Sequence, residues 1–307
     1  MSLDIHNLEC ELDQLRDKEY ISETTVDFFR DILRAQQKTK SILNNKNYTL
    51  LLTDDQIDNK LKAGTPLLSI TDIPLDALLI KELFNDICEI LQNQQNSDRE
   101  TVQKVVAAQS SGALDLITLI EKLVVHDSDY FRKLCNKLEI REDILVFIAL
   151  TMARPFFEMA TSRIQKMIDK NKWLKNYCPA CGSSAQISKI DKENGKRHLF
   201  CVLCGYEWRF ARIKCAFCNN EDQKSLGFID VKESSYRIHL CKKCMRYLKT
   251  LDERKAVDDK NVINPSIEDI ATTYLDMLAE EKGYERSWFF PASVDQIKAD
   301  EERKTVH

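Results

Sequence analysis

Glycine and proline are scarce in this chain of 307 residues, which contains only seven glycines and six prolines. Four of the seven glycines fall in one short segment, between residues 182 and 227. Because both residue types interrupt helices, their scarcity elsewhere favours long helices over most of the chain. Charged residues make up 31% and hydrophobic residues 43%, which is ordinary globular composition and excludes wholesale disorder.

A long hydrophobic run is also lacking. The longest nearly apolar stretch without charge is residues 144–153, whereas a bilayer-spanning helix needs about 20 residues. The N-terminus, MSLDIHNLECELD, is acidic and lacks the basic and apolar regions of a secretory signal. We therefore expect a cytoplasmic protein with no membrane partner.

Patterns typical of catalysis are missing as well. The sequence shows no Ser/His/Asp arrangement, no glycine-rich phosphate-binding loop and no paired carboxylate motif. His126, with Asp127 and Asp129, is interpreted as part of a solvated loop. We therefore predict that the protein is not an enzyme.

Cysteine, by contrast, is abundant and concentrated, since eight of the eleven cysteines lie between residues 178 and 244. They form four Cys-x-x-Cys knuckles, numbered one to four in chain order: Cys178/Cys181, Cys201/Cys204, Cys215/Cys218 and Cys241/Cys244. Nineteen residues separate knuckles one and two, and twenty-two separate knuckles three and four, close to zinc-ribbon spacing. A two-residue gap lets one tight turn direct both sulfurs at an ion about 2.3 Å away.

This spacing predicts two metal ions, each bound by four thiolates. Sequential pairing assigns Cys178, Cys181, Cys201 and Cys204 to site one, and Cys215, Cys218, Cys241 and Cys244 to site two. A cross-braced pairing, knuckle one with three and two with four, is the less favoured alternative. Four thiolates suit either zinc or iron, so the residues leave the metal open. His198 and His239 lie just before knuckles two and four and could be ligands. Because eight thiolates already fill two sites, we do not expect either histidine to bind a metal.

The residue that follows the second cysteine of each knuckle supports this interpretation at three of four positions. These residues are Gly182, Gly205, Asn219 and Met245. A metal knuckle often needs a positive φ there, which glycine and asparagine adopt readily. We therefore expect knuckle four either to be strained or to use a different turn.

The pattern predicts an α+β protein. We expect an all-helical N-terminal domain (1–175), two small rubredoxin-like or zinc-ribbon modules (176–210 and 211–255), and a C-terminal helix and tail (256–307).

Hydrophobic periodicity predicts the individual helices. They cover residues 1–20, a segment after Ser22, and residues 72–91, 97–110, 114–125, 130–138 and 143–170, and Pro155 should kink or break the last of them. Residues 50–69 are predicted as a connector, and strands over 198–202, 226–231 and 236–240. Ser266 with Asp269 is expected to cap one tail helix ending at Gly283. Cys88 and Cys135 are expected in the core.

The charge is distributed unevenly between these parts. Residues 172–255 carry a net charge of +9, and the remainder carries −13, so the total of −4 conceals a basic module within an acidic body. This asymmetry indicates either a charged partner or an internal contact between the two parts.

The sequence resembles the formate dehydrogenase accessory protein family, FdhE. The resemblance lies in the knuckle segments YCPACGS (177–183), FCVLCGYEW (200–208), RIKCAFC (212–218) and CKKCMRYLK (241–249). It extends to AGTPLL (63–68), ARPFFEMA (153–160) and DIATTYLDMLAEEKGYER (269–286), and therefore covers most of the chain.

The resemblance implies a role in maturing respiratory formate dehydrogenase before the enzyme is exported. It also implies cytoplasmic binding of the enzyme's catalytic, molybdenum-containing subunit, and iron carried by the eight cysteines. The chain departs from the family pattern at Met245, where glycine is usual, and at Arg209, where histidine is common. Whether the protein forms a homodimer stays open.

Two alternative functions also stay open. The basic module with Trp208, Phe210, Phe217 and Tyr247 would suit a zinc-ribbon nucleic-acid-binding protein, although the acidic body is a poor neighbour for phosphates. A rubredoxin-like redox protein is the other alternative. The aromatic segment 288–291 either folds back on the core or forms a docking patch.

Overall fold

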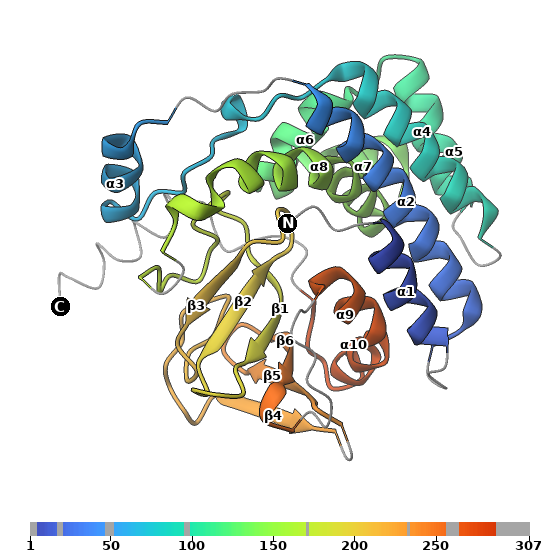
Figure 1. Ribbon diagram of the computed structural model, residues 1–307. Coiled ribbons are helices and arrows are strands. Elements are labelled where there is room, and N and C mark those ends of the chain that lie inside the picture. Colours follow the sequence, from blue (N-terminus) through green and yellow to red (C-terminus); the bar gives the residue numbers. More distant parts are fainter. Residues whose placement is uncertain are drawn as a thin grey trace.

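The N-terminal half of the protein is helical, as the sequence predicted. The computed structural model describes residues 5–16, 21–46, 52–94, 99–169, 172–231, 234–255 and 264–286. The N-terminal helices are α1 (Ile5–Arg16), α2 (Glu23–Asn45), α3 (Asp54–Lys62), α4 (Ala77–Asn93), α5 (Arg99–Ser110), α6 (Leu116–Val124), α7 (Ser128–Leu138) and α8 (Glu142–Ile164). Helix α8 contacts α2, α4, α5, α6 and α7, so it forms the centre of this part (Figure 1).

Side-chain caps explain where several helices begin. Ser22 Oγ accepts the backbone N–H of Thr25 at 3.1 Å, so Ser22 is the N-cap of α2. The helix predicted from residue 72 begins only at Ala77, because Asp76 accepts two N–H groups of its first turn.

The prediction of a plain connector over residues 50–69 was wrong, because α3 lies within it. Thr53 Oγ1 accepts the N–H of Gln56 at 3.3 Å, and the Gln56 side chain accepts the N–H of Thr53 at 3.0 Å. This reciprocal capping box starts the helix. Gly64, with a φ of +70°, follows its end.

Helix α8 runs without interruption through Pro155, where a kink or break was predicted. Proline has no N–H, so the carbonyl of Thr151, one turn earlier, loses its usual helical partner. The buried side chain of Gln36, on α2, donates a hydrogen bond to that carbonyl at 2.9 Å. A neighbouring helix therefore replaces the missing donor.

The same helix has the length and composition of a membrane span, when the following turn η2 (Gln165–Met167) is included. In the structure, 78% of its most apolar window is buried inside the protein. The apolar surface of α8 is therefore used in the core, among the helices that surround it.

The eight-cysteine segment forms one continuous mixed sheet. Its strands are β1 (Ala185–Ile190), β2 (Arg197–Cys201), β3 (Glu207–Phe210), β4 (Leu226–Asp230), β5 (Tyr236–Cys241) and β6 (Arg246–Asp252), in the order β3-β2-β1-β6-β5-β4. β1 and β6 pair in parallel, and every other neighbouring pair is antiparallel. Each half is a three-stranded unit with two knuckles, and the Ser188 and Thr250 hydroxyls meet at 2.7 Å where the halves join. The sequence predicted β2, β4 and β5 but missed β1, β3 and β6.

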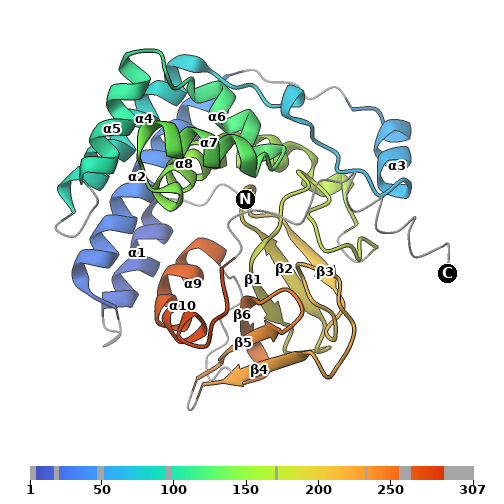
Figure 2. The same cartoon turned by 180° about the vertical axis from the view of Figure 1, so that it is seen from behind.

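The C-terminal segment packs between the sheet and the first helices (Figure 2). Two helices, α9 (Pro265–Ala271) and α10 (Thr273–Glu280), replace the single predicted helix. Asn264, and not Ser266, is the N-cap of α9. Helix α9 ends at Ala271, where the buried Lys249 ammonium binds the carbonyl of Asp269 at 2.9 Å and so satisfies one of the acceptors at the end of the helix. Residues 288–291 lie outside the described residues.

Charges of the basic sheet and the acidic remainder meet inside the protein. Lys249 Nζ lies 2.6 Å from Asp269 Oδ1 and 2.8 Å from Asp276 Oδ2, and Arg286 pairs with the same two carboxylates. Burial by itself would raise the pKa of Asp269, but Arg286 and Lys249 hold this pKa well below its usual range. The charge asymmetry is thus partly used in an internal contact.

We expect Gln36→Leu to lower the free energy of unfolding by about 1–3 kcal/mol, because the Thr151 carbonyl would then be buried without a donor. Urea unfolding of the metal-loaded protein, followed by circular dichroism, measures the change. In a Pro155→Ala background the restored N–H should remove most of this cost. Exposed Gln103→Leu is the matched control. Equal losses in both backgrounds would contradict the assignment.

Candidate metal centres

Two clusters of four cysteines form in the sheet region, and they follow the sequential pairing. Site one contains Cys178, Cys181, Cys201 and Cys204, and site two contains Cys215, Cys218, Cys241 and Cys244. Within each cluster all four sulfurs lie within 4.8 Å of one another. The cross-braced alternative is therefore not adopted.

The sulfur separations fit a tetrahedral thiolate site. In site one, Sγ–Sγ distances are 3.6 Å for Cys178/Cys204 and 3.4 Å for Cys181/Cys201. In site two, Cys215/Cys244 and Cys218/Cys241 are both 3.7 Å apart. Four sulfurs placed tetrahedrally at about 2.3 Å from a zinc ion would be about 3.8 Å apart. Each cluster could therefore hold one metal ion, and the donor set suits zinc and iron alike.

Backbone N–H groups support the sulfurs from within the knuckles. The N–H groups of Leu203 and Cys204 both point at Cys201 Sγ from 3.4 Å. Phe217 and Cys218 do the same for Cys215 Sγ at 3.4 and 3.5 Å. Such donors stabilise thiolates, which are the form that binds metals.

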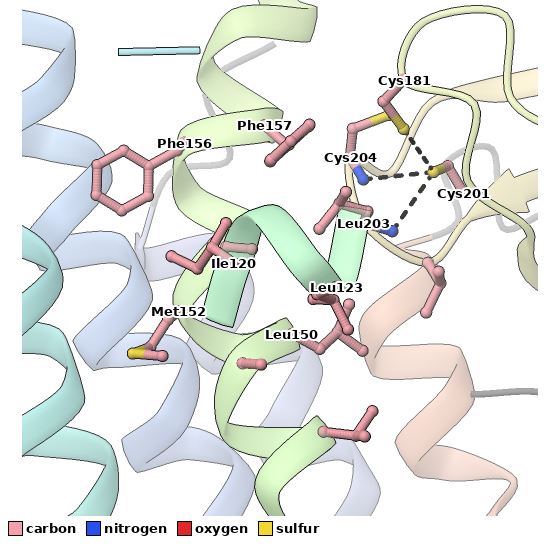
Figure 3. Packing of buried hydrophobic residues seen from close by; sticks show 14 of the residues in the cluster. Ile120, Leu123, Leu150, Met152, Phe156, Phe157, Cys181, Cys201, Leu203 and Cys204 are labelled. Atoms are coloured by element: carbon pink, nitrogen blue, oxygen red, sulfur yellow. Dashed lines mark hydrogen bonds between the residues drawn. The ribbon is translucent and has the colours of Figure 1, made fainter. Parts of the chain in front are cut away.

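Site one lies inside the hydrophobic core of the helical part. All four cysteines are buried, and they belong to the same cluster of buried residues as α4, α6 and α8. Figure 3 shows Leu203, between the cysteines of knuckle two, beside Leu123 and Phe157 of the helices. A metal ion in site one would therefore fix the two knuckles that pack against these helices.

The segment after α3 is bonded directly to knuckle one. Leu67 and Leu68 donate backbone hydrogen bonds to the carbonyls of Pro179 and Ala180, at 2.9 and 2.8 Å. Gly182 lies so close to this segment that an added Cβ would come within 3.0 Å of the Pro66 ring. The AGTPLL segment is thus part of the support of site one.

Aromatic side chains hold the connection between α8 and knuckle one. Trp173 Nε1 donates to the Tyr177 carbonyl at 2.6 Å, and the Tyr177 hydroxyl donates to the Gly64 carbonyl at 2.7 Å. Trp208 Nε1 donates to the Lys175 carbonyl at 2.9 Å. The indole and phenol groups therefore satisfy their polar atoms while they fill the core.

Asn176 connects the two sites. Its side-chain amide donates to the Phe217 carbonyl at 2.9 Å and accepts a hydrogen bond from the Asn219 side chain at 3.0 Å. Asn219 is the residue that follows knuckle three. The position of site two is thereby tied to the segment that enters site one.

Site two is more accessible than site one. Cys215 and Cys241 are buried, whereas Cys218 and Cys244 are half-buried. A hydrogen bond from Cys244 lowers the pKa of Cys215 to about 5, and backbone N–H groups of Cys218 and Phe217 act in the same direction. Burial raises the pKa of Cys218 to about 11. Hydrogen bonds thus favour the thiolate form of Cys215, which is the form that binds metals.

All four knuckles use the left-handed conformation at the residue after the second cysteine. The φ angles are +81° for Gly182, +67° for Gly205, +56° for Asn219 and +53° for Met245. The alternative of a different turn in knuckle four was wrong, and the expected strain is present. A side chain in this region costs about 1–2 kcal/mol.

The remaining sequence candidates have structural roles. His198 Nδ1 lies 2.9 Å from a carboxylate oxygen of Glu207 and outside both clusters. Asp127 caps α7 by accepting the N–H of Tyr130 at 2.9 Å. Cys88 and Cys135 are buried in helices, as predicted.

The aromatic residues of the basic module are core residues. Trp208, Phe210, Phe217 and Tyr247 are all buried. None of these four can therefore act as a stacking platform for bases, as the nucleic-acid alternative would require. His239, the second histidine near a knuckle, lies outside both clusters and lines a cavity beside site two.

Comparisons with known proteins agree with this architecture. Residues 177–212 match the family model "FdhE, central domain", and residues 213–291 match "FdhE, C-terminal domain". The chain is 27% identical over 274 residues to "Protein FdhE homolog" of Aquifex aeolicus, with 88% of each chain covered. It is 31% identical over 185 residues to the Haemophilus influenzae (strain PittEE) homolog, covering 56% of this chain and 60% of that one.

A solved structure shares the fold. The crystal structure of the FdhE protein from Pseudomonas aeruginosa superimposes with a TM-score of 0.60 at 20% identity. The match covers 92% of this chain and 93% of that chain, so it includes both the helical part and the sheet.

We expect the two sites to differ when cysteines are replaced. Cys178→Ser should prevent stable folding, because site one joins the sheet to the helical core and structural metal binding supplies about 10–16 kcal/mol in small domains. Cys218→Ser should keep the helical circular dichroism and about one metal ion per chain, since site two lies nearer the surface. Metal content by mass spectrometry and urea unfolding measure both, with exposed Cys10→Ser as the control. Equal folding of the two variants would contradict this division.

Met245→Gly should stabilise the metal-loaded protein by about 1 kcal/mol, because glycine adopts a positive φ without steric cost. The gain is smaller than the full strain because glycine is also more flexible in the unfolded chain. The exposed Met277→Gly in α10 is the control and should destabilise by about 1 kcal/mol. Urea unfolding at fixed metal concentration distinguishes the two. No gain for Met245→Gly would show that the turn is not strained.

Proposed function

The chain belongs to the FdhE family, and from this premise we propose that it is a formate dehydrogenase accessory protein. In this proposal it is a cytoplasmic maturation factor without enzymatic activity of its own. It binds the catalytic subunit of respiratory formate dehydrogenase before export. Each of its two clusters binds one ion, iron or zinc, through four cysteines.

The observation that carries the proposal is the difference between the two sites. A protein that needed only a structural metal would gain nothing from exposing its thiolates. Here site one is embedded in the core, and site two exposes part of Cys218 and Cys244. Met245, the neighbour of Cys244, is 42% exposed despite its strained backbone. We infer that site one supports the fold and that the surface at site two contacts the client.

The positive charge near site two supports the same surface as the place where the client binds. Lys242 and Lys243, within knuckle four, are exposed and lie on the basic sheet. A positive surface next to an exposed apolar side chain suits an acidic protein client better than it suits phosphates alone. Association through this surface should weaken as the salt concentration rises.

The test is an anaerobic pull-down of the tagged protein from its own host during growth on formate, with partners identified by mass spectrometry. We expect the formate dehydrogenase catalytic subunit to be enriched, with less captured at high salt. The Cys218→Ser/Cys244→Ser variant should lose at least 90% of this capture while it keeps its helical circular dichroism, and Cys10→Ser should lose none. Failure to capture that subunit with folded, metal-loaded protein would overturn the proposal.

A second candidate function is electron transfer at site two, which the half-exposed positions of Cys218 and Cys244 favour. It requires iron at this site in the protein isolated from its native cell, with a visible absorbance that bleaches on reduction. Full occupancy by zinc would exclude it.

A further inference from the structure

A cavity of about 500 Å³ lies beside site two, on one face of the sheet. This volume is within the range of about 300–1,000 Å³ that small-molecule sites occupy. Cys215 and Cys241 form part of its wall, so an occupant would lie against the metal site. The sheet face opposite to the cavity carries Ile238 and Tyr247, which pack against α10.

Strand register explains why these side chains meet. Arg237, His239 and Cys241 alternate along β5, so they share one face of the sheet. His239 is paired with Phe228 on β4 and with Leu248 on β6. The loop before β4 and Arg197, at the start of β2, complete the cavity.

The lining of the cavity is strongly cationic. It contains no aspartate or glutamate and five positively charged residues, which are Arg197, Arg212, Lys214, Arg237 and Arg246. Lys214 is paired with Glu221, and Arg237 is paired with Asp230 and Asp252, so three of the five cations remain without a carboxylate. Four thiolates around a divalent ion would carry a net charge of about −2, which three cations still exceed. The excess points to an anionic occupant.

Arg197 is the most unusual of these residues, because it is only 2% exposed. Its guanidinium stacks on Phe210 at 6.0 Å and donates one hydrogen bond, to the Lys214 carbonyl at 3.2 Å. Its Nε is buried without a hydrogen-bond partner, and no carboxylate among the described residues forms an ion pair with it. Burying a guanidinium with so few acceptors is unfavourable unless an anion is supplied.

Two further arginines of the lining have no acidic partner in the part of the chain that the structure describes. These are Arg212, which is exposed at the rim, and Arg246, which is half-buried over the Phe217 ring at 6.0 Å. Arg237, by contrast, is paired with Asp230 and Asp252. The guanidinium forks of Arg197, Arg212 and Arg246 are thus left to bind an anion, and such forks match phosphate oxygens in pairs.

The rest of the lining is apolar and includes exposed side chains. Ile213 is 59% exposed and Phe228 is 56% exposed, which is unusual for large hydrophobic residues. The Phe228 and His239 rings lie 6.5 Å apart, with Arg237 5.0 Å from the Phe228 ring. A flat apolar group can therefore be held at the same place as the anion.

From these observations we propose that the cavity between site two and the arginine cluster binds a phosphate-bearing organic anion of nucleotide size. The phosphate contacts Arg197, Arg212 and Arg246, and the flat part of the molecule lies against Phe228 and Ile213. Because the cavity shares Cys215 and Cys241 with site two, binding and the metal site affect each other. The proposal rests on this geometry and does not depend on the proposed role in formate dehydrogenase maturation.

The experiment uses the full-length protein loaded with zinc at both sites, titrated with the fluorescent nucleotide analogue trinitrophenyl-ATP. We expect saturable binding that ATP reverses and that adenosine, which lacks phosphate, does not reverse. Raising the salt concentration should weaken it. The Arg212→Ala/Arg246→Ala variant should bind at least tenfold more weakly, because these two side chains lie at the more accessible part of the cavity and can be shortened without disturbing the buried Arg197.

The matched control is Lys81→Ala/Lys282→Ala, which removes the same charge from exposed positions outside the cavity lining. It should bind the analogue within twofold of the unmodified protein. Three outcomes would overturn the proposal. The first is that the folded, zinc-loaded protein shows no saturable binding, which would mean that the arginines balance only the charge of the cluster. The second is that both variants weaken binding equally, which would indicate binding by overall charge. The third is that hexaglutamate displaces the analogue and ATP does not, which would assign the cavity to an acidic peptide.

Discussion

Four ionisable sulfurs in the middle of a hydrophobic core are the constraint on which this structure depends. Thiolates removed from water are strongly unfavourable unless a cation balances them. A metal ion in site one would supply that cation, and the helices, the 67–68 segment and the Trp173–Tyr177 connection are all arranged around the four sulfurs. A metal that binds there would therefore contribute directly to the stability of the fold.

The second site repeats the local pattern in different surroundings. Both sites use the same knuckle turn, and each sits on three strands of one sheet. The parallel pairing of β1 with β6 joins the two halves, so site two has a rigid support while Cys218 and Cys244 stay half-buried. One half of the repeat thus lies deep in the fold, while the other has a more accessible four-cysteine cluster beside a cationic cavity.

Several local expectations failed where a distant residue changed the outcome. Pro155 does not interrupt α8 because Gln36, on another helix, supplies the missing hydrogen bond. The predicted single tail helix is divided into α9 and α10, and Lys249, on β6, binds the Asp269 carbonyl where α9 ends. The missed helix α3 is different, since the Thr53/Gln56 capping box was present in the sequence and could have revealed it.

The sequence by itself determined the four knuckles, their sequential pairing and most helices, because a two-residue gap, a side-chain cap and helical periodicity act within a few residues. The strained backbone at Met245 was likewise predictable, because the residue after each knuckle adopts a positive φ. Tertiary structure alone decided which site is buried, how β1 finds β6, and that Arg197, Arg212 and Arg246 line one cavity. These features join residues far apart in the chain, and only the packing of the sheet against the helices brings them together.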